Sequence, residues 1–301
     1  MKKVLLLAVM LIASLVSTTQ AQILYRISGK GLESPSYIVG TYHLTPSSFA
    51  DSIPGMDKAI AETNQVCGEL DMMDAFKPEN AARLLKAQML PEGDTLSSLF
   101  TAEQLERLNA LLLEVMGTNL EDEAFAAQME KMTPVALSTT LTLTAYMKEM
   151  PSFNPMELID NYFQTLALQS GKSVKGFETV DFQMGVLFGD PLEKQANDLM
   201  CTVDNFEEAN RIAKLITNAY FTQNLQQIDE VLDEESKVKC GTSEEDEETL
   251  IYNRNRNWVD MMPEMMAEPT LFVVGAAHLC GEKGVLKLLE KAGYTVEGVK
   301  E

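Results

Sequence analysis

Two apolar runs of strand length lie at opposite ends of the chain, and the same short pattern follows each of them. Residues 37–39 precede a Gly-x-x-His-Leu pattern that contains His43, and residues 270–274 precede a second copy that contains His278. Glycine lets a strand turn sharply, so each histidine should lie just beyond a strand end, where open α/β sheets bind ligands. These are the only two histidines in the sequence, and their shared setting favours one common site.

The other strand-like segments also cluster towards the two ends. We expect strands at residues 24–27, 37–39, 65–70, 270–274 and 294–299, and a short one at 173–176. Helical spacing of apolar residues predicts helices at 78–89, 101–116, 134–150, 155–169, 191–218 and 244–262. Asn154 before Pro155 is typical of a helix start. The sequence therefore predicts an α/β fold whose central β-sheet is built from both chain ends, with a large inserted helical region at approximately 75–265.

The first 21 residues have the features of a secretory signal peptide. A basic start is followed by an apolar stretch at residues 4–16 and a small-residue exit at Ala21. That stretch is shorter than the roughly 20 residues that a membrane span needs. We therefore expect a mature α/β domain of residues 22–301 that is periplasmic or secreted, with no stable membrane span after signal cleavage. A retained N-terminal anchor is the alternative.

The composition excludes one class of partner. The chain has 24 Lys and Arg against 45 Asp and Glu, a net charge of −21. Such a surface repels the phosphate backbone, so we expect no nucleic-acid partner.

Four cysteines remain to be placed in an exported chain, where disulfides are permitted. Cys201 and Cys240 have polar, loop-like surroundings and are predicted to form a bridge across a helical excursion. Cys67 and Cys280 have apolar surroundings at strand ends, and they are either buried thiols or a second bridge.

A carboxylate near the two histidines would complete a common metal set. The best candidate is Glu69, which follows Gly68 at the end of the third predicted strand. Asp71 is the fallback. His43, Glu69 and His278 are thus the predicted metal ligands.

Four more residues could carry chemistry. Glu178 follows a short strand and a glycine, and it could be a ligand, a general base or a partner for an arginine. Arg254 and Asn255 lie on the inward face of the helix predicted at 244–262, and a buried cation needs an anion. Arg254 therefore either pairs with a structural acid or holds a substrate oxygen. Asp160 is similarly placed on an inward helix face.

These motifs, in this order, resemble those of the TraB/GumN family, which is related to the Tiki metalloproteases. The two Gly-x-x-His copies, Glu69, the stretch Gly176-Phe177-Glu178-Thr179 and the Arg254-Asn255 pair with Trp258 carry the resemblance. It implies a fold like that of the erythromycin-esterase and haem-binding ChaN group. It also implies peptide cleavage dependent on a divalent metal ion, with manganese or cobalt favoured. Cys280 stands where many relatives have proline, and a metal-binding cysteine would make zinc possible.

The leading interpretation is an exported divalent-metal-dependent hydrolase of the peptidase type, acting on a peptide or protein substrate. Glu178 would be the general base or an additional ligand, while Arg254 and Asn255 would stabilise the oxyanion or position the substrate. One alternative is a haem- or peptide-binding module without turnover. The other is a metal-free Cys–His or esterase-type hydrolase, since Cys280 lies two residues from His278.

Overall fold

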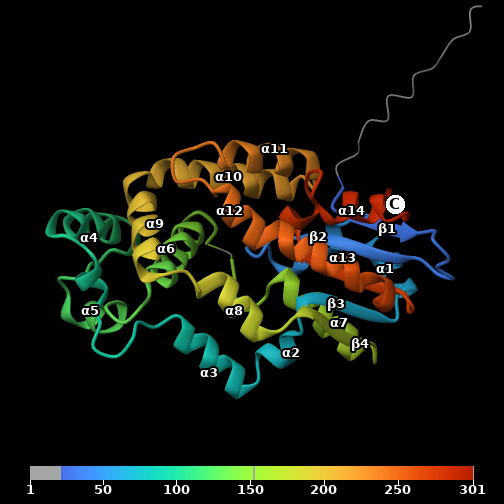
Figure 1. Ribbon diagram of the computed structural model, residues 1–301, viewed down its shortest axis with the longest axis horizontal. Helices are drawn as coiled ribbons and strands as arrows, with labels where there is room; N and C mark the ends of the chain where they lie inside the picture. Colours follow the sequence, from blue (N-terminus) through green and yellow to red (C-terminus); the bar gives the residue numbers. More distant parts are fainter. Residues whose placement is uncertain (1–21, 152, 301) are drawn as a thin grey trace, which may run out of the picture.

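The computed structural model describes residues 22–151 and 153–300, so the predicted signal peptide lies outside the described residues. Its centre is a six-stranded sheet in the order β4-β3-β5-β2-β1-β6 (Figure 1). The strands are β1 (Leu24–Ser28), β2 (Ser36–Thr41), β3 (Gln65–Leu70), β4 (Ser173–Glu178), β5 (Thr270–Gly275) and β6 (Thr295–Gly298). β4, β3, β5 and β2 are mutually parallel, whereas β1 runs antiparallel to both β2 and β6. The predicted α/β class and the six predicted strands are confirmed.

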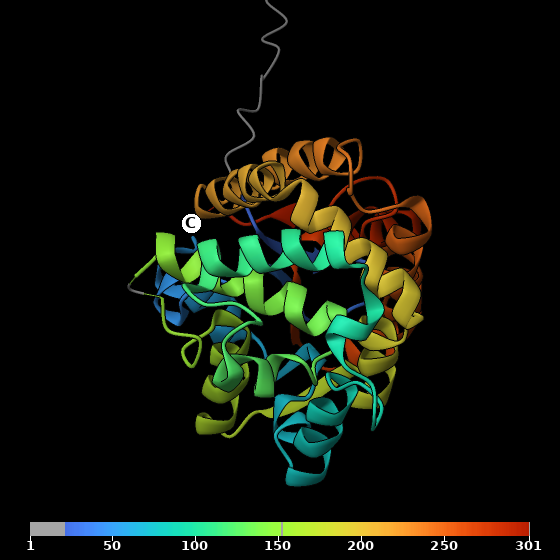
Figure 2. The ribbon, with the colours of Figure 1, turned by 90° about the vertical axis from the view of Figure 1, so that its left-hand side faces the viewer.

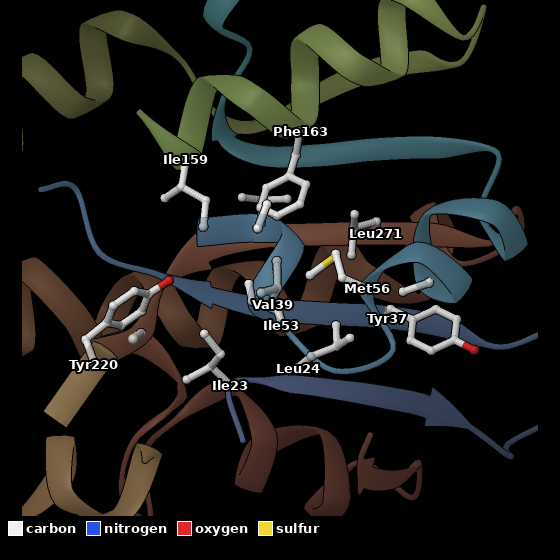
Figure 3. Close-up of a cluster of buried hydrophobic side chains, with 14 of the residues drawn as sticks. Ile23, Leu24, Tyr37, Val39, Ile53, Met56, Ile159, Phe163, Tyr220 and Leu271 are labelled. Atoms are coloured by element: carbon white, nitrogen blue, oxygen red, sulfur yellow. The ribbon is translucent and has the colours of Figure 1, made fainter. Parts of the chain in front are cut away.

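The central parallel strands are apolar on both sides, as expected for strands that are covered on both faces. In β5, Leu271 and Val273 point into one core, whereas Phe272 and Val274 point into the other. Figure 3 shows the first core, where Val39 of β2 and Leu271 meet Phe163. Strand-end residues are therefore held between two packed layers.

Different helices cover the two faces (Figure 1). The first face is packed by α1 (Met56–Glu62), α7 (Ile159–Gln169), α10 (Phe206–Phe221) and α11 (Leu225–Glu235). The second is packed by α13 (Asn253–Met265) and α14 (Val285–Lys291). The inward positions predicted on the α13 segment are confirmed, because Arg254, Asn255, Trp258 and Met262 are all buried.

A third core lies among helices away from the sheet. It joins α4 (Ala102–Met116), α5 (Glu123–Met129), α6 (Pro134–Glu149) and α9 (Leu192–Asp204), and Figure 2 shows α4 and α6 side by side in front of the sheet. The boundaries 75–265 for an insertion stay a prediction; within them, β4 pairs with β3 and α13 packs on the sheet.

The remaining elements are short, apart from α3 and α8. They are η1 (Ser47–Ser52), α2 (Met72–Ala75), α3 (Pro78–Ala87), η2 (Leu96–Leu99), α8 (Val180–Phe188), α12 (Glu244–Glu247), the π-helical turn η3 (Glu248–Tyr252) and η4 (Ala276–Leu279).

Two predicted helices have different boundaries. The predicted start at Asn154 and Pro155 is wrong, because α7 begins at Ile159. The preceding residues pair with the segment after His43 instead: Ser47 N donates to Glu157 O (2.8 Å) and Ile159 N to Thr45 O (3.1 Å). The predicted helix at 191–218 is broken at Asn205, whose backbone leaves the helical region and whose side chain donates to Cys201 O (2.8 Å).

The cysteines divide as the sequence suggests. Cys201 and Cys240 form a disulfide with a Cα–Cα distance of 5.6 Å, which confirms the predicted pair. Cys67 and Cys280 are buried free thiols rather than a second bridge. Across the described residues, every helix is too short or too polar to cross a bilayer.

Candidate active site

The parallel register brings the carboxyl ends of β2, β3, β4 and β5 to one edge of the sheet. Glu69 is the second-last residue of β3 and Glu178 is the last residue of β4. His43 and His278 lie just after β2 and β5. Gly40 permits this arrangement, because a Cβ atom there would lie 3.0 Å from Ala276 Cα and from Leu279 Cδ1. The turn that carries His278 therefore packs directly on β2.

Glu69 and His278 face each other across this edge. Glu69 Oε1 accepts a hydrogen bond from Gly275 N (2.8 Å) and lies 3.8 Å from His278 Nε2. Burial acts to raise the pKa of Glu69, but His278, Arg254 and His43 outweigh it and lower that pKa below its usual value. Glu69 is therefore an ionised carboxylate next to an imidazole nitrogen.

The orientation of His278 is set by Asn255. The Asn255 amide nitrogen donates to His278 O (3.2 Å) and Lys283 O (3.0 Å), so its Oδ1 is the atom that meets His278 Nδ1 at 2.7 Å. Nδ1 then carries the ring proton and Nε2 keeps its lone pair. Burial lowers the pKa of His278 to about 4, against the opposing charge of Glu69. At neutral pH, the unprotonated Nε2 of His278 lies near Glu69 and accepts a hydrogen bond from Arg254 Nη1 (3.3 Å).

Arg254 lies between the two glutamates. Its Nε and Nη2 bind Glu178 Oε1 and Oε2 (2.8 and 2.9 Å), and Nη2 also binds Glu69 Oε2 (2.5 Å). Nη1 donates to Leu250 O (2.8 Å) in the π-helical turn and lies 3.3 Å from His278 Nε2. The structure shows Arg254 paired with acids, which is the first of the two interpretations drawn from the sequence.

Glu178 is fully engaged in this network. Its Oε1 also accepts from Trp258 Nε1 (2.9 Å), and its side chain is only 5% exposed. Neither oxygen faces the pocket described below. The geometry therefore supports a positioning role for Glu178, holding Arg254, more than the role of general base or ligand.

His43 has its own carboxylate. Its Nδ1 lies 3.1 Å from Asp160 Oδ2, and Thr41 Oγ1 donates to Asp160 Oδ1 (2.5 Å). The charge and the hydrogen bond of Asp160 raise the pKa of His43 to about 9. The side chain of His43 is 72% exposed, and its contact with Asp160 uses Nδ1 rather than Nε2. Both histidines are thus held through Nδ1.

A pocket of about 370 Å³ opens at this edge. His43, Glu69 and Arg254 line it together with Asp160 and Gln183. Gln183 donates to Glu69 Oε2 (3.3 Å) and was not predicted, since nothing in the α8 sequence marks it. The fallback acid Asp71 is a helix cap instead, accepting from Met73 N (2.9 Å) and Asp74 N (3.3 Å).

Comparison with known proteins agrees with these motifs. The model of the TraB/PrgY/gumN family matches residues 23–298. The chain belongs to this family. The resemblance inferred from the sequence is confirmed.

Curated relatives of this TraB/PrgY/gumN protein include proteins named as metalloproteases. The chain is 23% identical to "Metalloprotease TIKI homolog" of Amphimedon queenslandica, over 93% of the chain and 62% of the relative. It is 24% identical to "Metalloprotease TIKI1" of Xenopus tropicalis, over 88% and 59%. It is 23% identical to "Metalloprotease TIKI2" of Danio rerio, over 87% and 58%. The chain thus spans about three-fifths of these relatives' length. No solved structure matches it.

The structure brings the predicted ligands of this TraB/PrgY/gumN protein together only in part. Glu69 Oε1 and His278 Nε2, 3.8 Å apart, are both within reach of one ion, since each metal–ligand bond spans about 2 Å. His43 lines the pocket but is held by Asp160. Within residues 22–151 and 153–300, no three His, Cys, Asp or Glu side chains stand close enough together to hold a metal ion.

The cysteines do not support a thiolate nucleophile. Cys280 Sγ faces the carbonyl oxygens of Ala276 (3.5 Å) and Leu225 (3.8 Å) in the core on the α10 and α11 side. Burial raises the pKa of the Cys280 thiol, and it raises the pKa of Cys67 to about 12. Since the thiolate is the reactive form, neither residue is suited to the Cys–His alternative.

Proposed function

We propose that this TraB/PrgY/gumN protein is a divalent-metal-dependent hydrolase of the peptidase type, acting in the periplasm or outside the cell. The observation that carries the proposal is the way in which the two imidazole rings are held. Each is held at Nδ1 by an oxygen, Asn255 Oδ1 for His278 and Asp160 Oδ2 for His43. Metal-binding histidines have this arrangement, because the bond at Nδ1 fixes the ring so that Nε2 faces the ion. His278 offers its Nε2 lone pair at neutral pH, whereas His43, whose pKa is raised to about 9, would release its Nε2 proton on binding.

Glu69, His278 and His43 would hold the ion. The first two already face each other. His43 is exposed and its ring is held by Asp160, so a side-chain movement could bring it to the pair. Two imidazoles and one carboxylate suit manganese or cobalt as well as zinc. Because Cys280 faces the opposite core, the thiolate that would favour zinc is not in this donor set.

When bound, such an ion would polarise a peptide carbonyl and make water a stronger nucleophile near neutral pH. Arg254 would stabilise, through its charge alone, negative charge that develops on the substrate oxygen. Its guanidinium lines the pocket, but its N–H groups are bonded within the site. Glu178 would hold Arg254, and Asn255 would hold the His278 tautomer. Asp160, the other carboxylate lining the pocket, would hold the ring of His43 through Nδ1. The Tiki relatives, named metalloproteases, support a peptide or protein as substrate.

The test is metal content and peptide hydrolysis in protein purified without chelator or metal-affinity resin. We expect bound metal and chelator-sensitive cleavage in the parent protein, and loss of both in His278→Ala and His43→Ala. Glu282→Ala is the control, because its side chain is 80% exposed and pairs only with Lys291. Equal metal content in all four proteins, or cleavage that a chelator leaves unchanged, would refute the proposal.

Export is tested separately. Residues 1–21 and the Cys201–Cys240 disulfide support it. N-terminal sequencing of protein recovered outside the cytoplasm should begin at Gln22. An intact Met1 would contradict signal cleavage.

A further inference from the structure

Three hollows on the surface join end to end at the segment that carries His43. The pocket of the active site shares His43 and Leu158 with a second hollow of about 410 Å³. That hollow in turn shares Leu44 and Thr142 with a third of about 340 Å³, which reaches α10. We call this row of neighbouring hollows, from the active site past α6, the α6 groove.

The middle hollow of the α6 groove is apolar. Six of its lining residues are Leu44, Val135, Leu143, Phe153, Pro155 and Leu158. The hydroxyl groups of Thr139 and Thr142 also lie on this lining, but they donate to the carbonyl oxygens of Val135 (2.9 Å) and Ser138 (3.0 Å) within the helix. Their protons are therefore committed. The other polar residues on the lining are Ser138 and His43, and the surface of the hollow is mainly apolar.

The position of this hollow limits what can occupy it. It shares His43 and Leu158 with the active-site pocket, so one molecule can occupy both. A chain that passes from one to the other is extended, and successive residues of an extended peptide rise about 3.3 Å each. Neighbouring side chains of one peptide can therefore reach the site and the hollow together.

We propose that the middle hollow is a specificity subsite that takes one large apolar side chain, such as Leu, Met or Phe, of an extended peptide bound in the active site. The proposal rests on the peptidase function above and names its substrate class. Burying such a side chain is favourable in proportion to the apolar area removed from water, and this apolar lining lies on a chain of net charge −21. A peptide with a charged residue at that position would lose water contacts without gaining a partner.

The test uses a set of peptides of one sequence, varied at a single position among Leu, Phe, Gly, Lys and Asp, with cleavage followed by mass spectrometry. We expect kcat/KM for Leu and Phe to exceed that for Gly, Lys and Asp by about 10- to 100-fold. Thr139→Trp should fill the hollow and remove this preference, because Thr139 is exposed on α6 and lines the hollow.

Met147→Trp is the matched control, since Met147 is 42% exposed on the same helix and lines none of the three hollows. It should leave the preference intact. Cleavage without preference, or a preference that survives Thr139→Trp, overturns the subsite and leaves the hydrolase function standing.

A second measurement separates the two proposals. If no peptide is cleaved, fluorescence anisotropy of the labelled Phe and Lys peptides measures binding alone. Tighter binding of the Phe peptide that Thr139→Trp abolishes supports the subsite while the hydrolase function fails. Equal binding of the two peptides, or no binding, overturns the subsite.

Discussion

At the scale of single residues, Arg254 is the most constrained group in the site. It is one cation shared by two carboxylates, and its side chain and that of Glu178 are 7% and 5% exposed. Removing ions from water costs several kcal/mol per ion, which their attraction offsets only when the remaining polar atoms are satisfied. Here the indole of Trp258 and the carbonyl of Leu250 complete the set. Breaking the pair should therefore be far more harmful than the loss of a surface ion pair.

Glu178→Gln should lower the free energy of unfolding by about 3 kcal/mol, because it leaves part of a buried guanidinium charge without its partner. Lys291→Ala, which breaks the exposed pair with Glu282, should change it by less than about 1 kcal/mol. Urea unfolding measures both.

A double-mutant cycle makes this prediction specific to the pair. Arg254→Met should cost less in a Glu178→Gln background than in the parent protein, because the buried charge is then removed with its partner. Additive effects of the two substitutions would show that Glu178 and Arg254 do not stabilise each other.

Asn255 lends itself to a prediction about orientation. Asn255→Asp keeps an oxygen for His278 Nδ1 but loses the donor to His278 O and Lys283 O. Asn255→Ala loses the oxygen and the donor. If the proposed metal site is correct, Asn255→Ala should weaken metal binding by about 10- to 100-fold, as other changes to groups that hold ligand histidines do. Isothermal titration with Mn²⁺ measures this, and unchanged affinity would contradict the role of Asn255.

Much of the site could be read from the sequence, because strand ends, glycines and helix faces have short-range signatures. These place His43, Glu69 and His278 at one sheet edge and Arg254 on an inward face. The hydrogen bonds that occupy both oxygens of Glu178 could not be predicted in this way. Their donors, Trp258 and Arg254, lie 80 and 76 residues away in the sequence. Gln183 reaches Glu69 across 114 residues and carries no local signal.

At the scale of elements, the contact between β2 and η4 controls the His278 turn. Gly40→Ala would place a methyl group 3.0 Å from Ala276 Cα. Since backbone atoms there can shift only with the turn, we expect a loss of about 1–3 kcal/mol in unfolding free energy and a displaced His278.

Gly185→Ala is the control for this substitution. Gly185 is exposed in α8, and a Cβ atom there would meet nothing within 4 Å. Alanine should be neutral or stabilise the helix by up to about 1 kcal/mol. Thermal unfolding compares the two variants, and equal effects would show that the tight contact at Gly40 is not limiting.

The strands were predicted better than the helices for a physical reason. A strand such as β5 is an apolar run that ends at a glycine, a signal contained in six residues. The start of α7 depends instead on residues 157–159 pairing with residues 45–47, more than a hundred positions away. Local capping chemistry at Asn154 is real, since its side chain accepts from Met156 N (3.0 Å), but it forms a turn rather than a helix start.

At the scale of the whole molecule, the disulfide ties the helical region together. It joins residues separated by 39 positions, between α9 and the turn after α11. Closing a loop of this length should stabilise the fold by up to about 4 kcal/mol through the entropy of the unfolded chain. The Cys201→Ser, Cys240→Ser double variant should lose this amount in urea unfolding, and reductant should have no further effect on it. A parent protein that is equally stable with and without reductant would contradict the prediction.

The strand order has a consequence for how the chain is made. β5 is the fifth strand in sequence, yet it lies between β3 and β2 in the middle of the sheet. Until residue 275 has left the ribosome, β2 and β3 have no partner at the edges that β5 will join. Unpaired strand edges are where chains associate wrongly. These two strand edges therefore stay open until the last strand but one has been made, and the two histidines of the site meet only at the end.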